Sequence, residues 1–212
     1  MDLITFDLDE TLISAKRCHF LAFNDAFKKF GLKKISYKKL KPLLNGRHAH
    51  EIVKILYPKL SKLEVDKIAK EHHKLIATKY GRYAKKIKGA ILSLKKIKKK
   101  YKIGIATNCT HKEINGLLKG AKINKNLFDI IVGKDDVKKS KPAPDEFIIA
   151  GRKTKTKIKY HVGDSPYDII AGKKAGIKVI AVLTGVNSRK VLSKQKPYKI
   201  VKSIRNVPEV IL

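Results

Sequence analysis

Asp7-Leu8-Asp9-Glu10-Thr11 closes an apolar stretch that begins at Leu3, almost at the start of the chain. The run from Leu3 to Asp7 is short and mostly apolar, which predicts a buried strand. Because residues i and i+2 of a strand point to the same side, Asp7 and Asp9 are expected to approach the same point. The segment therefore predicts a strand that carries two carboxylates at its carboxyl end.

Further runs of this kind recur along the chain and alternate with amphipathic helical stretches. The other expected strands are 103–107, 128–132, 160–163 and 178–182. The alternation favours an α/β fold with a parallel sheet. Ligands of such sheets bind at the carboxyl ends of the strands, so the residues that follow these runs are the candidates for a functional site.

Residues 14–85 follow a different pattern, with helical periodicity and no clear strand. Phe20, Phe23 and Phe27, for example, recur at helical spacing. We expect an inserted α-helical cap domain at residues 14–85 and an α/β core domain formed by residues 1–13 and 86–212. Within the core, a helix is expected over 87–100, and a short strand and terminal helix over 198–212.

Three more polar segments lie at or just after expected strand ends. They are Thr107-Asn108, Lys141-Pro142-Ala143-Pro144-Asp145 and Gly163-Asp164-Ser165-Pro166-Tyr167-Asp168. Each one alone has an ordinary structural interpretation; the last, for instance, is typical of a helix N-cap at Ser165 or Asp164. Their order, and their shared place after strands, indicate a single site.

The combined set of side chains suits phosphoryl transfer. A carboxylate that attacks a phosphate dianion needs a cation between the like charges, and Asp164 and Asp168 add the oxygen ligands that Mg²⁺ prefers. Asp9 is suited to act as a general acid and base. Hydroxyl, amide and ammonium groups would stabilise the phosphoryl oxygens. These phosphate-binding residues are expected to be Thr107, Asn108 and Lys141.

In these four segments the chain resembles the haloacid dehalogenase superfamily, in the branch whose helical cap lies between the first and second motifs. The resemblance covers essentially the whole length and implies a Rossmann-like core. The Lys-Pro-Ala-Pro-Asp and Gly-Asp-Ser-x-x-Asp forms, followed by Ala171-Gly172 and Ala175-Gly176, are most similar to phosphoglycolate phosphatases and their relatives. This implies a Mg²⁺-dependent phosphoric monoester hydrolase for a small anionic phosphomonoester.

The resemblance also implies a role for each acidic residue. Asp7 would be the nucleophile and a metal ligand, and Asp9 the acid and base, with its backbone carbonyl on the metal. Asp164 would bind the metal directly, and Asp168 through water or from behind the direct ligands. Because the dehalogenases of the family lack the acid that Asp9 provides, the expected reaction is phosphoryl transfer through an aspartyl-phosphate.

The cap is expected to select the substrate. Asn45-Gly46-Arg47-His48 resembles the glycine-bearing cap loop that faces the active site in relatives, and Arg47 would grip a carboxylate or second phosphate of the substrate. The alternative is that Arg47 is a surface residue at a helix start. The histidines are expected to be ordinary surface residues rather than metal ligands: His48, His50, His72, His73 and His161.

Charge raises other possibilities. The 212 residues include 50 Lys and Arg against 18 Asp and Glu, a formal net charge of +32. This excess is spread over both predicted domains and is mostly Lys, whereas Arg is the better residue for bidentate phosphate recognition. We expect a general compositional bias, with a nucleic-acid partner as the less favoured alternative. Two other functions stay open, a β-phosphoglucomutase-like phosphomutase and a basic nucleic-acid-binding protein on a hydrolase fold.

The remaining composition is that of an ordinary globular protein. No apolar run approaches the roughly 18 residues of a membrane span, and no basic segment precedes the first apolar stretch, so neither membrane insertion nor a secretory signal is expected. Two cysteines show no metal-ligand spacing. We expect a cytoplasmic monomer or homodimer that binds a small phosphorylated metabolite.

Overall fold

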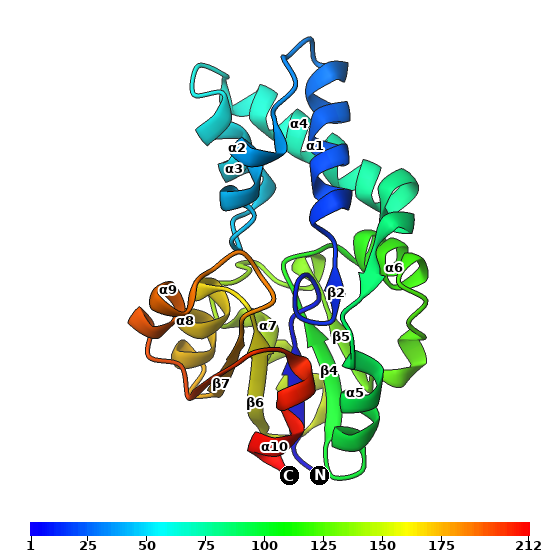
Figure 1. Ribbon diagram of the computed structural model, residues 1–212, viewed down its shortest axis with the longest axis vertical. Helices are drawn as coiled ribbons and strands as arrows, with labels where there is room; N and C mark the ends of the chain where they lie inside the picture. The colour runs from blue at the N-terminus through cyan, green and yellow to red at the C-terminus, as the bar shows by residue number, and fades with distance from the viewer.

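The computed structural model describes residues 1–212 and shows two units, one on top of the other (Figure 1). The sheet unit, residues 1–15 and 84–212, is a parallel sheet between helices. The helical unit, residues 16–83, stands on the edge of the sheet where its strands end. Both termini lie at the opposite edge, far from the helical unit.

Six parallel strands form the sheet. All five strands expected from the sequence are present, and a sixth lies in the C-terminal segment where a short strand was expected. In spatial order they are β5 (Ile130–Val132), β4 (Lys102–Ala106), β1 (Leu3–Phe6), β6 (Ile158–Gly163), β7 (Lys178–Val182) and β8 (Lys199–Val201). The predicted α/β class with a Rossmann-like parallel sheet is therefore confirmed.

Helices cover both faces of this sheet. The α-helices of the sheet unit are α5 (Ala90–Lys98), α6 (His111–Gly120), α7 (Asp145–Thr154), α8 (Pro166–Lys174), α9 (Arg189–Lys194) and α10 (Pro208–Ile211). Short 3₁₀ turns lie at Lys125–Leu127, Lys134–Asp136 and Ile204–Asn206. No helix of the protein has the length and apolar character needed to cross a membrane.

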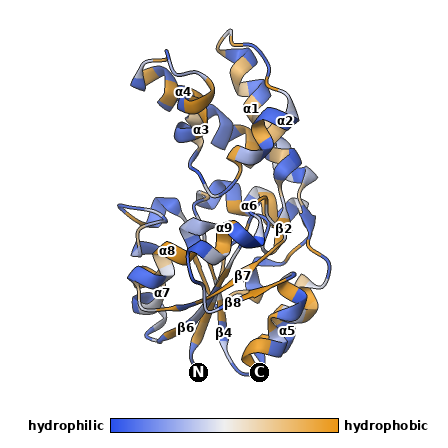
Figure 2. Cartoon of the chain, turned by 60° about the vertical axis from the view of Figure 1, so that its left-hand side comes forward, coloured by the Kyte–Doolittle hydropathy of each residue, from blue (hydrophilic) through white to orange (hydrophobic).

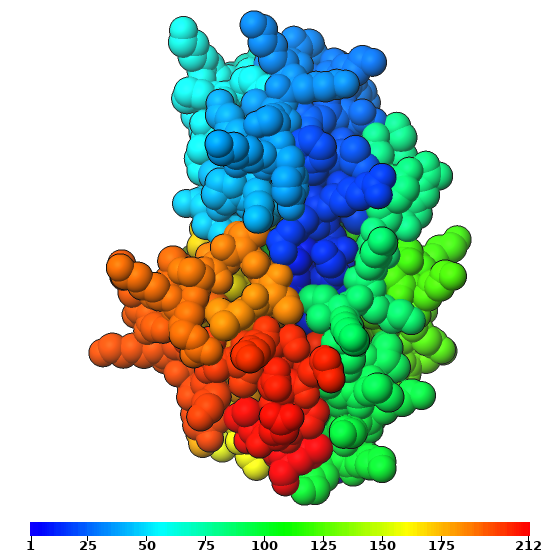
Figure 3. Space-filling view, viewed as in Figure 1, coloured from blue at the N-terminus to red at the C-terminus, as the bar shows by residue number.

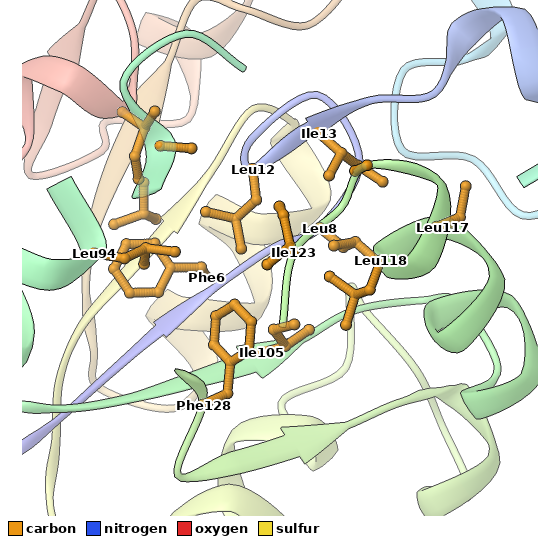
Figure 4. Packing of buried hydrophobic residues seen from close by; sticks show 14 of the residues in the cluster. Phe6, Leu8, Leu12, Ile13, Leu94, Ile105, Leu117, Leu118, Ile123 and Phe128 are labelled. Atoms are coloured by element: carbon orange, nitrogen blue, oxygen red, sulfur yellow. The ribbon is translucent and has the colours of Figure 1, made fainter. Parts of the chain in front are cut away.

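The central strand β1 is buried along its whole length and supplies both faces of the core. Ile4 and Phe6 pack with residues of α5 and α6, in a cluster that also holds Leu94, Ile105 and Leu118 (Figure 4). Leu3 faces the other way, toward α7 and α8. In Figure 2 the strands are mostly coloured as hydrophobic, whereas hydrophobic and hydrophilic residues alternate along the surrounding helices. Because β1 is buried on both faces, its sequence is a nearly continuous apolar run.

The helical unit has a hydrophobic core of its own, in which Phe23, Phe27 and Ile68 are fully buried. Its helices are α1 (Lys16–Lys29), α2 (Tyr37–Leu40), α3 (Ala49–Leu56) and α4 (Lys62–Leu75). A 3₁₀ turn follows α2 at Lys41–Leu43. After α4 the chain continues through a π-helical turn, Ile76–Tyr80, and a 3₁₀ turn, Gly81–Tyr83.

Two connections join the units. Strands β2 (Ile13–Ser14) and β3 (Lys85–Lys86) pair antiparallel where the chain leaves and re-enters the sheet unit, a pairing that the sequence pattern did not predict. On one side the backbones also touch closely: a Cβ on Gly120 of α6 would lie 2.0 Å from the carbonyl oxygen of Gly81. Figure 3 shows the helical unit, in blue and cyan, seated directly on the sheet unit.

Candidate active site

A cavity of about 120 Å³ lies between the two units. Side chains from both units line it, including every residue that the sequence analysis assigned to the site. These residues are Asp7, Asp9, Arg47, Thr107, Asn108, Lys141, Asp164 and Asp168. The structure therefore brings together residues that are up to 161 positions apart in the chain (168 − 7).

The sheet topology explains this convergence. β1 lies between β4 and β6, so the residues that follow these three strands meet at one edge of the sheet. Asp7 follows β1, Thr107 follows β4, and Asp164 follows β6. The expected position of ligands at the carboxyl ends of parallel strands is thus the position of the cavity.

Lys141 is at the centre of the buried polar network. Its Nζ atom donates hydrogen bonds to Asp7 Oδ1 at 2.8 Å, to Asp168 Oδ1 at 2.6 Å and to the carbonyl oxygen of Ala106 at 2.9 Å. Burial disfavours the charged ammonium, but Asp168 and Asp7 outweigh burial and raise the pKa of Lys141 above its ordinary value. The side chain is therefore a fixed positive charge at the floor of the cavity.

Asp168 braces this lysine. Its Oδ1 accepts hydrogen bonds from Lys141 and from His161 Nε2, at 3.1 Å, and its Oδ2 accepts from the backbone N–H and the hydroxyl of Ser165 at 3.0 and 2.6 Å. Burial acts to raise the pKa of Asp168, yet Lys141 and His161 hold it below the ordinary value. Ser165 is the N-cap of α8, as one structural interpretation of its segment predicted. Both carboxylate oxygens of Asp168 thus accept hydrogen bonds from within the protein.

His161 was expected at the surface but is fully buried, and this expectation was wrong. The residue lies in β6, where its Nδ1 contacts the Thr5 hydroxyl at 3.0 Å and its ring packs against Phe147. Burial lowers the pKa of His161, so the imidazole is neutral. A neutral ring that donates from Nε2 to Asp168 accepts from Thr5 at Nδ1, which satisfies both nitrogens.

The acidic side chains of Asp7, Asp164 and Asp168 form a group with one carboxylate oxygen of each within 4.8 Å of the others. Asp164 is 6% exposed, and no protein hydrogen bond reaches its carboxylate oxygens. Burial, Asp168 and Asp7 together raise the pKa of Asp164 well above its ordinary value. Burial likewise raises the pKa of Asp7 to about 7. Buried carboxylates without enough positive partners are what a hard divalent cation such as Mg²⁺ satisfies, so the donor set fits this ion.

Asp9 faces the helical unit. Its Oδ2 contacts His19 Nε2 of α1 at 2.8 Å and Cys109 Sγ at 3.6 Å, whereas its Oδ1 is buried without a hydrogen-bond partner. Burial acts to lower the pKa of His19, but Asp9 outweighs it and raises that pKa. The sequence analysis missed His19, because nothing in a helical stretch marks a histidine that contacts the other unit.

Two groups beside Lys141 suit the binding of phosphoryl oxygens. Thr107 is 2% exposed and lines the cavity. The backbone N–H of Asn108 has no acceptor within the protein. The side-chain amide of Asn108 and the Nε2 atom of His48 both contact the carbonyl oxygen of Lys141, at 3.1 and 3.0 Å, which fixes the loop that carries the lysine.

The loop at residues 45–48 enters the cavity from the helical unit. Gly46 has φ of +101°, and a Cβ there would lie 2.8 Å from Ser165 Cβ, so only glycine fits this approach to the sheet unit. Arg47 lines the cavity, and its Nη1 atom donates to Asn45 Oδ1 at 2.8 Å. Arg47 is thus a cationic residue that the helical unit contributes to the lining of the cavity.

The histidines of the helical unit differ in their burial. His72 of α4 is 2% exposed, so the expectation of a surface residue was wrong for this residue too. Its Nε2 contacts His19 Nδ1 at 3.1 Å, and its ring stacks on Phe23. His50 is exposed as expected, whereas His48 and His73 are half-buried and line the cavity.

Comparisons with known proteins found relatives of this chain both in sequence and in fold. Pyrophosphatase PpaX from Bacillus mycoides is 26% identical to this chain over an alignment of 212 positions, gaps included, which covers 93% of this chain and 90% of that protein. A haloacid dehalogenase-like family hydrolase from Streptococcus pneumoniae superposes with a TM-score of 0.86 at 20% identity, covering 100% of this chain and 99% of that one. A protein described as a predicted phosphoglycolate phosphatase from Haemophilus somnus gives a TM-score of 0.82 at 22% identity, with 100% and 98% coverage.

The two superposed structures show that the fold is shared. The stronger finding concerns the sequence, because the family model of the haloacid dehalogenase-like hydrolases matches residues 4–182, which include the acidic residues, the lysine and the helical unit. This match spans most of the chain and agrees with the motifs around the cavity. The chain therefore belongs to the haloacid dehalogenase-like hydrolase family and is an enzyme of the hydrolase class.

Proposed function

We propose that this enzyme is a Mg²⁺-dependent phosphatase that hydrolyses a small anionic phosphomonoester, of which phosphoglycolate is the favoured example, through an aspartyl-phosphate on Asp7. One observation carries the proposal: Asp7 is buried at the floor of the cavity between the Lys141 ammonium and the unpaired carboxylate of Asp164. This arrangement pairs a nucleophile with the positive charge that a phosphate dianion requires.

Asp7 and Asp164 would hold Mg²⁺ with carboxylate oxygens, and Asp9 with its backbone carbonyl. Asp168 would support the site from behind, since Lys141, His161 and Ser165 already occupy its oxygens. Bound Mg²⁺ supplies positive charge that keeps the neighbouring carboxylates ionised and reduces their repulsion of the substrate phosphate.

In the first half-reaction an ionised Asp7 oxygen attacks the phosphorus atom. The bond from phosphorus to the ester oxygen breaks, that oxygen leaves with the electron pair, and protonated Asp9 gives it a proton. Lys141 and the donors of Thr107 and Asn108 stabilise the charge on the phosphoryl oxygens. The products are the free alcohol, phosphorylated Asp7 and ionised Asp9.

The second half-reaction restores the enzyme. Ionised Asp9 takes a proton from water while the water oxygen attacks the phosphorus atom, and the bond between phosphorus and Asp7 breaks with its electron pair returning to the Asp7 carboxylate. Inorganic phosphate leaves, and Asp9 is protonated again for the next substrate. One carboxyl group thus serves as acid and then as base.

The size and the lining of the cavity favour a small, multiply charged substrate. Its volume is about 120 Å³, and Arg47, Lys16 and several histidines line the side that faces the helical unit. We assign residues 14–85 as the cap domain that closes over the substrate, with residues 1–13 and 86–212 as the core. The names of the relatives point the same way, since pyrophosphate and phosphoglycolate are both small and highly anionic. We further place the enzyme in the cytoplasm as a monomer or homodimer.

A phosphate-release screen with Mg²⁺ tests the proposal. The substrates are phosphoglycolate, pyrophosphate, sugar phosphates and nucleotides, with Asp7→Asn as the catalytic variant and Asp66→Asn, an exposed substitution on α4, as the matched control. We expect Asp7→Asn to abolish release and Asp66→Asn to leave it unchanged. Activity retained by Asp7→Asn would contradict the assignment of the nucleophile.

The same preparation separates the alternatives. Isomerisation of glucose 1-phosphate without phosphate release would replace the phosphatase with a phosphomutase. Binding of RNA that weakens with salt, with no turnover of any ester, would instead favour a nucleic-acid-binding protein.

A further inference from the structure

A second cluster of metal-binding side chains lies at the junction between the two units. His72 and His73 come from α4, and Glu113 comes from the first turn of α6. One nitrogen or oxygen atom of each lies within 4.8 Å of the others, and His73 Nδ1 is 2.7 Å from Glu113 Oε1. The proposed phosphatase reaction uses none of these three residues.

His72 has the chemical state that a metal ligand needs. Burial, together with His19 and His73, lowers the pKa of His72 well below its ordinary value, so its imidazole is neutral. Its Nδ1 atom is buried and has no hydrogen-bond partner. An unpaired buried nitrogen is unfavourable, and a bound ion would provide the missing partner.

Glu113 is held in place by its own helix. Its Oε2 accepts hydrogen bonds from the backbone N–H and hydroxyl of Thr110, at 2.9 and 3.0 Å, in a capping box at the start of α6. The other oxygen, Oε1, is turned toward His73. The carboxylate is 1% exposed, so its charge is poorly solvated. The cluster therefore holds an anchored negative oxygen next to two imidazoles.

The junction around the cluster is closely packed. The chain that follows α4 packs so closely on α6 that a Cβ on Gly116 would lie 2.7 Å from the carbonyl oxygen of Ala77. Backbone contact of this kind brings the end of α4 against α6 and places the three side chains near one another. Ligands at bonds of about 2.0–2.1 Å around a tetrahedral ion lie about 3.4 Å apart. Side-chain rotations that move the ligand atoms by on the order of 1 Å would thus bring them to the spacing of a tetrahedral site.

We propose that His72, His73 and Glu113 form a site for a divalent transition-metal ion, with Zn²⁺ as the best fit, separate from the acidic group of Asp7, Asp164 and Asp168. Two imidazoles and one carboxylate match zinc, whereas the all-carboxylate group matches magnesium. A water molecule would complete the tetrahedron on the cavity side.

Another cluster, His111 with Asp135 and Asp136, provides the contrast. His111 Nε2 and Lys153 already pair with the Asp136 carboxylate, and none of the three residues is buried. Its groups are solvated and paired, so its histidine serves as a matched control.

The test is Co²⁺ binding to the full-length protein in excess Mg²⁺, followed by the intense visible absorption of four-coordinate Co²⁺. His72→Phe removes the imidazole and retains an aromatic ring that can stack on Phe23. Glu113→Gln removes the charge and retains a side chain that can complete the capping box of α6. We expect one Co²⁺ per chain in the wild type and in His111→Gln, and affinity at least about 10-fold weaker in both cluster variants. Circular dichroism verifies that each variant is folded.

Asp164→Asn separates this site from the acidic group. The Co²⁺ band should persist in Asp164→Asn, and displacement by Zn²⁺ should remove it. The proposal is overturned if no such band forms, or if the band is lost in Asp164→Asn but kept in Glu113→Gln. Because absorption is the readout, the result holds whether or not the protein is a phosphatase.

Discussion

Lys141 Nζ lies 2.6 Å from Asp168 Oδ1, although both side chains are almost completely buried. A buried ion pair requires both partners, because no water is present to solvate one charge when the other is removed. The pair also links three elements, since Asp168 completes the cap of α8 and contacts His161 of β6. The contact therefore supports both the stability of the fold and the position of the lysine beside Asp7.

Asp168→Asn should destabilise the protein by about 3–5 kcal/mol, because it leaves a buried ammonium with one carboxylate fewer. Urea unfolding at neutral pH measures this loss. Asp66→Asn, in an exposed position of α4, is the control and should change the free energy of unfolding by less than about 0.5 kcal/mol. Equal stability of the two variants would show that Asp168 does not hold Lys141.

His161 is predicted to act as a positioning residue for Asp168. His161→Phe removes the donor to Asp168 and the contact with Thr5, and we expect a destabilisation of about 1–3 kcal/mol with a lower kcat for phosphate release. His161→Gln retains a side-chain donor and should recover part of both. If phenylalanine and glutamine give the same kcat, the hydrogen bond to Asp168 has no part in turnover.

Gly185→Ala should weaken Mg²⁺ binding without unfolding the protein. A Cβ at this position would lie 1.8 Å from Asp164 Oδ2, so the carboxylate must move. We expect a loss in Mg²⁺ affinity on the order of 10–100-fold, read from the Mg²⁺ dependence of the melting temperature. In Gly151→Ala of α7 the nearest atom would be 3.4 Å away, so this control should bind Mg²⁺ normally. Unchanged affinity in Gly185→Ala would remove Asp164 from the metal site.

The raised pKa of Asp7 predicts that the stability of the metal-free protein depends on pH. Burial raises the pKa of Asp7 to about 7 in the folded chain, from an ordinary value of 3.8. Between these two pH values the unfolded chain has lost the Asp7 proton and the folded chain has kept it, so stability falls as pH rises toward 7. At most this costs on the order of 4 kcal/mol, from about 3 pH units.

Asp7→Asn removes the titrating group and hence this part of the pH dependence. In EDTA, the free energy of unfolding of Asp7→Asn relative to wild type should increase steadily from pH 4.5 to pH 7.5. Added Mg²⁺ should reverse the trend by stabilising the wild type alone. A difference that stays constant over this pH range would show that Asp7 is already ionised in the metal-free fold.

Local patterns were sufficient to predict the elements that hold the site. The strand at 178–182 matches β7 in both bounds, and the strand around Leu3 ends one residue earlier than expected. These strands are buried on both faces, so their apolar runs are unambiguous. The segments after them then had to meet, because parallel strands place their carboxyl ends at one edge. The assigned roles of the site residues stay predictions.

Contacts between distant elements were beyond the reach of sequence patterns. His19 lies near Asp9, and Glu113 lies near His73, only because α1, α4 and α6 adopt one particular packing. His161 lies in the buried part of β6, and its burial depends on the partners that Thr5 and Asp168 provide. A polar residue is buried when its hydrogen bonds are satisfied, and a single sequence does not show those partners.

The most direct test of the account is to locate the phosphoryl group on the enzyme. In Asp9→Asn the base for the second step is absent, whereas an aryl phosphate with a good leaving group needs no acid in the first step. We therefore predict that Asp9→Asn, mixed with such a substrate and Mg²⁺ and quenched in acid, carries one phosphoryl group on the peptide that contains Asp7. Asp7→Asn combined with Asp9→Asn should carry none. A phosphoryl group on any other residue, or turnover without a phosphorylated enzyme, would contradict the aspartyl-phosphate mechanism.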